Sequence, residues 1–269
     1  MKKMTGAFAG TLVLCLMTSG LPAGEAPGKP GAAWPKGQYA ALDRLPDWGG
    51  VWVLGRGKPA PPAAGAASAG RPGPGAPPEQ PQLKGDYLAA YQAWQKDTRE
   101  HNGMVRKQTS NCMPPGMPGM MGSAQYPIEF LFTPGRVTTL HEAWMQNRTI
   151  FTDGRGHPDD LEPGIFGHSI GHWEGDTLVV DTIGIKTITE LAQGMKHSDK
   201  LHVIERIHLV KDDPDTLVDE MTMEDPEALA VPYHRTLTYQ RKRDWNLMEF
   251  VCAENDRNPV GADGLTQFK

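Results

Sequence analysis

The sequence has no surplus of basic charge and few long apolar runs. Its 27 Lys and Arg residues are outnumbered by 32 Asp and Glu residues, which gives a formal net charge of −5 at pH 7. Proteins that bind nucleic acids neutralise phosphates with Lys and Arg side chains, so we do not expect nucleic acid as a partner. After the N-terminal region no apolar run is long enough for a transmembrane helix, so we expect no membrane span.

Fingerprints of several catalytic classes are also missing. The sequence contains neither a phosphate-binding loop nor a dinucleotide-binding glycine pattern. His141-Glu142 begins like the H-E-x-x-H motif of zinc proteases, but Met145 stands where the second histidine is required. These absences argue against kinases, dehydrogenases and zinc proteases, and we expect no bound cofactor.

The N-terminal region, residues 1–23, is typical of a secretory signal peptide. Lys2 and Lys3 precede the apolar run GAFAGTLVLCLM, and the small residues of SGLPAGEA provide a cleavage zone. We therefore expect cleavage after Ala23 and a periplasmic or secreted protein.

The remaining chain divides by composition into three parts. Segment 24–54 holds a first strand, which we expect within DRLPDWGGVWVLG (43–55) after a turn, and segment 82–269 holds a helix and a β-rich domain. Between them, the stretch 55–81 is rich in Pro, Gly and Ala. Such a composition cannot bury enough apolar surface to offset the entropy of ordering, so we expect a disordered linker there.

Cysteine is scarce, with three residues in the whole chain. Cys15 lies in the signal peptide, which leaves Cys112 and Cys252 in an oxidising compartment, where two cysteines most simply pair. A disulfide between them would close a loop of about 140 residues and stabilise the fold by about 4–5 kcal/mol in the entropic model. The alternative is two buried free thiols.

Periodicity predicts one amphipathic helix followed by many strands. In DYLAAYQAWQKDTREH, Tyr87, Tyr91 and Trp94 recur at helical spacing and form an aromatic stripe that we expect to pack on the main domain. From Tyr126 onward the period is two, with regular turn signals, and indicates eight or nine strands in an antiparallel meander. A sheet of this length tends to close on itself, so the prediction is a mostly β fold with a calycin- or lipocalin-like barrel. A two-sheet sandwich is the alternative.

Two resemblances support this fold class. Gly50-Val51-Trp52 resembles the G-x-W opening of lipocalins, in which a tryptophan closes the base of the barrel. The blocks CMPPGMP, YPIEFLFTPGRV, RTIFTDGRGHP, GHSIGHWEGDTLVVDT, LHVIERI and EFVCAEN are similar to a family of exported bacterial proteins of unassigned function. That resemblance implies an exported β-rich domain and supplies no activity.

The segment GHSIGHWEGDTLVVDT (167–182) predicts a hairpin with a catalytic candidate. If Glu174-Gly175 is the loop, His168 faces Asp181 and Ile170 faces Val179 on one side of the sheet. Phe166 shares that side. If it lines a cavity, His168 and Asp181 are a general acid/base pair, with Phe166 and Ile170 as ligand-binding residues. If that side packs against another layer, the pair is a structural hydrogen bond.

Further charged residues interrupt apolar faces of predicted strands. Glu205, Asp219 and Arg235 each alternate with apolar residues, and an isolated charge on an apolar face is costly unless it is paired. Paired with one another, they would form a polar floor inside the barrel for the polar end of a ligand. His141 joins them as a ligand-binding candidate. The alternative is that these strands lie at an edge where both faces are wet.

The segment CMPPGMPGMM (112–121) raises a metal alternative. Methionine thioethers in an exported loop can bind copper(I), but they also fill gaps in a core. We assign no metal ligands from the sequence.

Three functional classes follow. The first is an exported barrel that binds a small, partly apolar molecule, and one form of it is a cofactor-independent isomerase, cyclase or lyase that uses the His–Asp pair. The second is an exported protein that binds copper or zinc, and the third is a structural or interaction module without a pocket. The sequence does not predict the oligomeric state.

Overall fold

The computed structural model describes residues 38–55, 80–103, 112–123 and 126–252. The predicted signal peptide (1–23) and nearly all of the predicted linker (55–81) lie outside these ranges. The helices in the described part are η1 (Gln38–Arg44), α1 (Gly85–Glu100), η3 (Gly119–Gly122) and η4 (Ala143–Met145).

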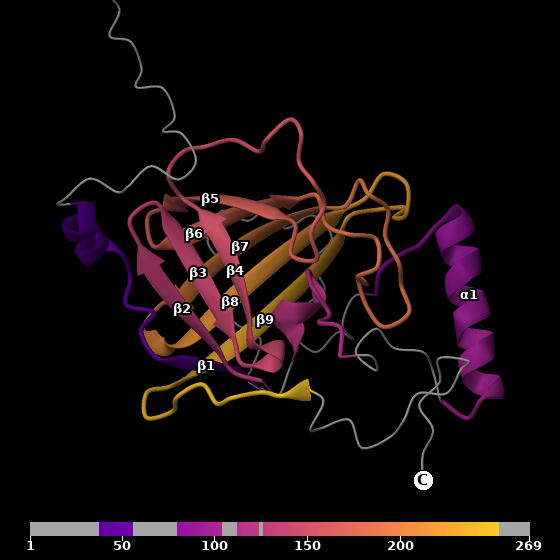
Figure 1. Ribbon diagram of the computed structural model, residues 1–269, viewed down its shortest axis with the longest axis horizontal. Coiled ribbons are helices and arrows are strands. Elements are labelled where there is room, and N and C mark those ends of the chain that lie inside the picture. The colour runs from indigo at the N-terminus through magenta and orange to yellow at the C-terminus, as the bar shows by residue number, and fades with distance from the viewer. Residues whose placement is uncertain (1–37, 56–79, 104–111, 124–125, 253–269) are drawn as a thin grey trace, which may run out of the picture. The chain divides into compact units, whose positions relative to one another are not determined.

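Within the described ranges, nine strands form one closed barrel, in which spatial order follows chain order and β9 pairs with β1 (Figure 1). The predicted mostly β fold with a closed barrel is confirmed, and the sandwich alternative is excluded. The relationship to calycins stays a prediction. The strands are β1 (Val51–Leu54), β2 (Ile128–Thr133), β3 (Arg136–His141), β4 (Gln146–Phe151), β5 (His168–Glu174), β6 (Thr177–Ile183), β7 (His202–Val210), β8 (Asp213–Glu224) and β9 (Tyr233–Lys242).

One strand pair departs from the predicted antiparallel meander. β4 and β5 are parallel, with Ile150 opposite Ser169 and Phe151 opposite Ile170. Parallel neighbours need a long crossover connection, and the loop 152–167 provides it. This connection matters for the candidate site, because it brings His157 back to β5 and β6.

The strand register identifies the inner face of the barrel. Directly paired residues project to the same side of a sheet, so a series of paired residues on successive strands shares one face. From β3 to β9 this series is Val137, Ile150, Ser169, Thr182, Val203, Met223 and Tyr233, and all of them are buried.

Tryptophans lie at one end of the barrel. The buried Trp48 ring contacts Phe130, Phe132 and Trp173, with ring centroids 5.2 to 5.4 Å apart. The Arg241 guanidinium lies 4.6 Å from the ring centroid of Trp52, which is also buried. These aromatic contacts give this end a rigid, apolar base.

The methionine segment contributes to the core. Met117, Met120 and Met121 are almost fully buried, and Tyr239 donates a hydrogen bond from its hydroxyl to the Met121 carbonyl oxygen at 2.6 Å. The geometry agrees with the gap-filling interpretation of these methionines.

Cys112 and Cys252 form a disulfide with a Cα–Cα distance of 5.6 Å, which confirms the predicted pairing. The bond spans 140 residues and joins the segment before β2 to the chain after β9.

The predicted helix is confirmed as α1, and its aromatic stripe packs against other residues. Tyr87 and Tyr91 contact the core, and Trp94 lies against Gly194, where a β-carbon would overlap the indole. Of the helices in the described ranges, none has the length and apolar character needed to cross a membrane.

Candidate functional site

The β5–β6 hairpin differs from the prediction by two positions in its register. Glu174 pairs with Thr177, so the loop is Gly175-Asp176, and His168 faces Ile183 while Ile170 faces Asp181. Gly175 adopts φ +60°, a conformation that glycine accepts readily, and this favours the loop that starts one residue later. Because the shift is two positions, His168 and Asp181 stay on the same face as diagonal neighbours.

That face points outward, so it does not line the barrel interior, as the catalytic interpretation required. His168, Ile170 and Asp181 are partly exposed, whereas Val180 and Thr182 on the opposite face are buried. Both faces of this hairpin carry apolar residues, so alternation alone did not distinguish inside from outside. Phe166 precedes β5 and its ring stacks on that of His141, with centroids 6.3 Å apart. The catalytic role of His168 and Asp181 stays a prediction.

Gly167-His168-Ser169-Ile170-Gly171 also fits the G-x-S-x-G pattern of hydrolase nucleophiles. In the structure Ser169 lies within β5, is buried, and shares hydrogen bonds with Arg148 and Thr182. A nucleophile elbow instead exposes its serine on a sharp turn between a strand and a helix. The match is therefore a coincidence of the strand sequence.

Two further histidines join the predicted pair and form what we call the wall cluster: His157, His168, Asp181 and His202. His157 Nδ1 lies 2.8 Å from His168 Nδ1, and His157 Nε2 lies 3.3 Å from Asp181 Oδ1. His202 Nε2, from β7, lies 2.7 Å from the same oxygen. Asp181 therefore accepts hydrogen bonds from two imidazoles, and His157 accepts one from His168.

The surroundings of the wall cluster keep His168 neutral. Burial lowers the pKa of His168 below its ordinary value, and the neighbouring His157 and Arg155 side chains act in the same direction. Arg155 is held by Asp153, with Nε 2.9 Å from Oδ1, and its guanidinium lies over Phe151. These contacts anchor the loop 152–167 next to the cluster.

The barrel interior holds a second polar group, the interior cluster of Arg148, Glu205 and Asp219. Arg148 donates to both carboxylate oxygens of Glu205, at 2.9 and 2.5 Å, and to the hydroxyls of Ser169 and Thr182. The predicted partner of Glu205 was Arg235, and the observed partner is Arg148. Arg235 is partly buried, with its guanidinium against Gly122.

Asp219 is the least satisfied member of the interior cluster. It is fully buried, and neither carboxyl oxygen has a hydrogen-bond partner among the residues that the structure describes. Burial raises its pKa well above the ordinary value, and the negative charge of Glu205 raises it further. The carboxyl group therefore favours its protonated form.

His141 and Tyr239 adjoin this interior charge. Burial lowers the pKa of His141 to about 3, and the charge of Arg148 acts in the same direction. His141 Nε2 lies 2.9 Å from Thr139 Oγ1. Burial also raises the pKa of Tyr239, and the neighbouring carboxyl groups of Asp219 and Glu205 act in the same direction. His141, Glu205 and Asp219, which were predicted to bind a ligand, are therefore packed in the core, so a molecule would reach them only by displacing core side chains.

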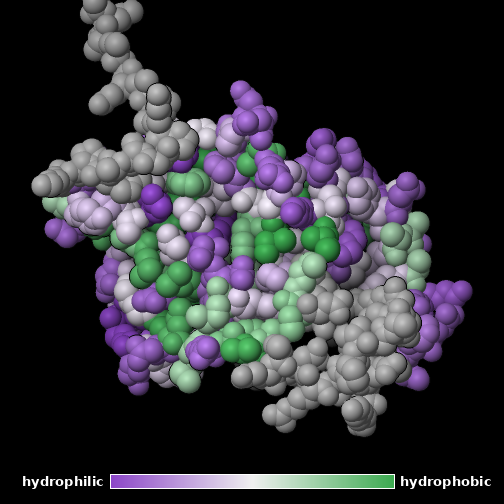
Figure 2. Space-filling model, in the orientation of Figure 1, coloured by the Kyte–Doolittle hydropathy of each residue, from purple (hydrophilic) through white to green (hydrophobic). Residues whose placement is uncertain are grey.

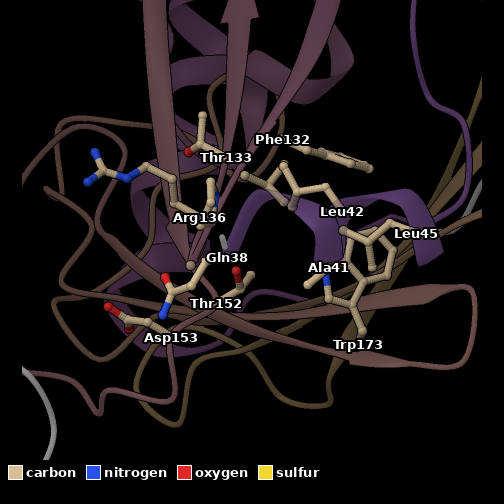
Figure 3. A pocket seen from close by; sticks show the side chains of 13 residues that line it. Gln38, Ala41, Leu42, Leu45, Phe132, Thr133, Arg136, Thr152, Asp153 and Trp173 are labelled. Atoms are coloured by element: carbon tan, nitrogen blue, oxygen red, sulfur yellow. The ribbon is translucent and has the colours of Figure 1, made fainter. Parts of the chain in front are cut away.

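An open pocket lies elsewhere, where η1 meets the β2–β3 turn, and we call it the end pocket. Its volume is about 420 Å³. Its apolar side holds Leu42, Leu45, Phe132 and Trp173 (Figure 3). The opposite side is polar and holds Gln38, Thr133, Arg136, Thr152 and Asp153. The lining residues are Gln38, Ala41, Leu42, Leu45, Phe132, Thr133, Pro134, Gly135, Arg136, Val137, Thr152, Asp153 and Trp173.

Neighbouring residues determine the charge and the hydrogen bonding of polar groups at the end pocket. The hydrogen bond from the Arg155 side chain lowers the pKa of Asp153, so its carboxylate stays charged. The Thr133 hydroxyl is buried and has no hydrogen-bond partner among the described residues. Over the face shown in Figure 2, hydrophobic atoms gather on the left, over β2, the strand that contributes Phe132.

The end pocket, His202 and Arg148 were not identified from the sequence. In the described ranges, no group of three or more His, Cys, Asp or Glu side chains could hold a metal ion. A comparison with protein-family models and with curated proteins finds no match to this chain.

Proposed function

We propose that the protein is an exported β-barrel that binds a small amphipathic molecule in the end pocket. The observation that carries the proposal is the division of that pocket into an apolar side and a polar side (Figure 3). The apolar body of the ligand would lie against Leu42, Leu45 and Trp173. Its polar end would face the side that holds Thr133, Thr152 and Asp153.

The size and rigidity of the pocket support this function. Small-molecule sites are concave, mostly apolar, and span about 300–1,000 Å³, with a few polar groups that orient the ligand. Phe132 and Trp173 contact each other at 5.5 Å between centroids, and both contact the buried Trp48. A floor held by three aromatic rings needs little reordering when a ligand binds, so less binding energy is lost.

The disulfide supports the export part of the proposal. Structural disulfides persist mainly in oxidising compartments such as the periplasm or the extracellular space. The bond between Cys112 and Cys252 is therefore consistent with the signal-peptide pattern at Lys2 and Lys3.

A fluorescent amphiphile tests the pocket. Anilinonaphthalene sulfonate, which has an apolar ring system and one anionic group, should bind the native protein in one saturable step. Leu42→Glu places a carboxylate on the apolar side, where it repels the anionic probe and disfavours its apolar rings, and should weaken this binding at least tenfold. Leu42 is only partly buried, so the variant should fold.

The matched control is Leu131→Glu, the same change at an exposed position of β2 outside the pocket. It should leave probe affinity nearly unchanged. Equal affinity for Leu42→Glu and the native protein, with both folded by circular dichroism, would show that the pocket does not bind the probe.

A further inference from the structure

We propose that the ligand of the end pocket is an amphiphile with an anionic head group of the carboxylate class, and that Arg136 determines this preference. The inference rests on the proposed function, because it names the class of molecule that the same pocket binds. Three features carry it: the strand pattern that divides the pocket, the ion pair that neutralises Asp153, and the donors on the polar side.

The division of the end pocket comes from the β2–β3 hairpin. Phe132 pairs with Val137 on one face of the sheet, and Thr133 pairs with Arg136 on the other. Paired residues share a face, and successive residues of a strand point to opposite faces. All four residues line the pocket. The end of the hairpin therefore presents an apolar pair and, beside it, a polar pair that includes a positive charge.

The chain after β4 brings a carboxylate to the same polar side. The Thr152 backbone N–H donates to the Gly135 carbonyl oxygen at 2.8 Å, which holds Thr152 and Asp153 beside the β2–β3 turn. Asp153 is already paired. Arg155 Nε lies 2.9 Å from Oδ1 and 3.0 Å from Oδ2, and Arg155 Nη2 lies 2.5 Å from Oδ2. This ion pair has no net charge, so a cationic head group would have to displace Arg155 to reach the carboxylate.

Arg136 therefore gives the polar side its sign. Among the described residues that line the pocket, Arg136 and Asp153 are the charged ones. In Figure 3 both charged groups lie on the opposite side of the view from Leu45 and Trp173. A guanidinium has planar N–H donors that match the two oxygens of a carboxylate. An anionic head group gains charge-assisted hydrogen bonds here that a neutral or cationic head group does not.

Hydroxyl groups on the polar side add donors for the same head group. The Thr133 hydroxyl is buried and has no hydrogen-bond partner among the described residues, and an unpaired buried hydroxyl carries a free-energy cost. An ionised carboxylate accepts several hydrogen bonds at once. Because Thr133 and Arg136 are directly paired, one carboxylate can accept from both side chains.

The experiment compares three probes that share a naphthalene ring and differ in the head group: naphthoate, naphthylmethanol and naphthylmethylammonium. Each is titrated into the protein and followed by calorimetry at neutral pH. We expect naphthoate to bind about tenfold more tightly than naphthylmethanol, and the ammonium to bind most weakly. Arg136→Gln should remove the tenfold advantage of naphthoate and leave the affinity for naphthylmethanol unchanged, because the substitution removes only the charge.

The matched control is Arg99→Gln, the same change at an exposed position of α1 outside the pocket, which should keep the preference for naphthoate. Equal affinities of the native protein for naphthoate and naphthylmethanol, or equal losses for both in Arg136→Gln, would overturn the anionic class while the proposed function stands. If none of the three probes binds, the proposed function fails together with this inference.

Arg136 is partly buried at the first position of β3, so a second measurement covers a variant that does not fold. Added sodium chloride screens the attraction between the head group and the guanidinium. It should therefore weaken the binding of naphthoate to the native protein and leave that of naphthylmethanol unchanged. The same response of both probes to salt would overturn the proposal.

Discussion

The buried charges of the barrel interior divide into one satisfied pair and one unsatisfied acid. The fork of Arg148 binds both oxygens of Glu205, and the hydroxyls of Ser169 and Thr182 accept two further hydrogen bonds from the guanidinium. Asp219 is equally buried and lacks hydrogen-bond partners among the described residues. Removing one partner from a buried pair leaves an uncompensated charge. Removing an unsatisfied acid instead eliminates the free-energy cost of its desolvation.

Two similar substitutions in the interior cluster should therefore have different effects on the free energy of unfolding. Glu205→Gln should lower the free energy of unfolding by about 3–5 kcal/mol, because Arg148 loses its counter-charge. Asp219→Asn should change the free energy of unfolding little at pH 5. As pH rises, the variant should become more stable relative to the native protein. The raised pKa of Asp219 means that the folded state holds its proton longer than the unfolded state, so native stability falls as pH rises above about 4. Urea unfolding across this range measures both, and equal losses at every pH would contradict the assignment.

His141 predicts the opposite pH dependence. Its pKa is lowered to about 3, so below pH 6.5 the unfolded chain binds a proton that the folded protein does not. This difference should reduce stability by about 2 kcal/mol between pH 6.5 and pH 5, at about 1.36 kcal/mol per pH unit. This decrease in the free energy of unfolding should disappear in His141→Gln and should persist in the exposed control His172→Gln. If the free energy of unfolding of His141→Gln falls with acid pH as steeply as that of the native protein, His141 is not the cause of the decrease.

Single residues could be placed inside or outside only where their strand has one apolar face. Glu205 and Asp219 alternate with buried apolar residues and were predicted to lie inside, where the structure has them. His157 lies in a loop, and His202 reaches Asp181 through the β6–β7 register, which the connection 184–201 does not fix. No local signal could therefore have assembled the wall cluster.

At the scale of elements, hairpin loops decide the register of the wall. The predicted loop Glu174-Gly175 and the observed loop Gly175-Asp176 use the same glycine in different positions. The positive φ of Gly175 selects the observed one, and this requirement cannot be read from alternation. The parallel β4–β5 pair was missed for a related reason, because a long loop permits either direction.

Gly175 should accordingly be intolerant of a side chain. Gly175→Ala should lower the free energy of unfolding by about 1 kcal/mol, because a β-carbon disfavours the left-handed conformation. Its surroundings are open within 4 Å, so the cost comes from the backbone alone. Gly156→Ala, also in open space but without a positive φ, is the control and should be neutral. Equal melting temperatures for the two variants would contradict this account.

At the scale of the whole molecule, closure of the sheet and the disulfide define the fold. The sequence predicted a barrel because an open sheet of this length exposes two edges, and the pairing of β1 with β9 removes them. The double variant Cys112→Ser, Cys252→Ser should lower the free energy of unfolding by about 2–5 kcal/mol, because the bond closes a loop of 140 residues. Chemical unfolding of both proteins without reductant measures this loss, and equal midpoints would show that the bond adds no stability.

The end pocket could not be predicted, because its lining comes from η1, the β2–β3 turn, the chain after β4 and the end of β5.

The central claim is that a small amphipathic molecule binds in the end pocket. The most direct test is NMR of leucine methyl groups during titration with anilinonaphthalene sulfonate. The account predicts saturable shifts at Leu42 and Leu45, with little change at the buried Leu191 and Leu201 outside the pocket. Shifts centred on Leu191 and Leu201, or none at Leu42 and Leu45, would contradict it.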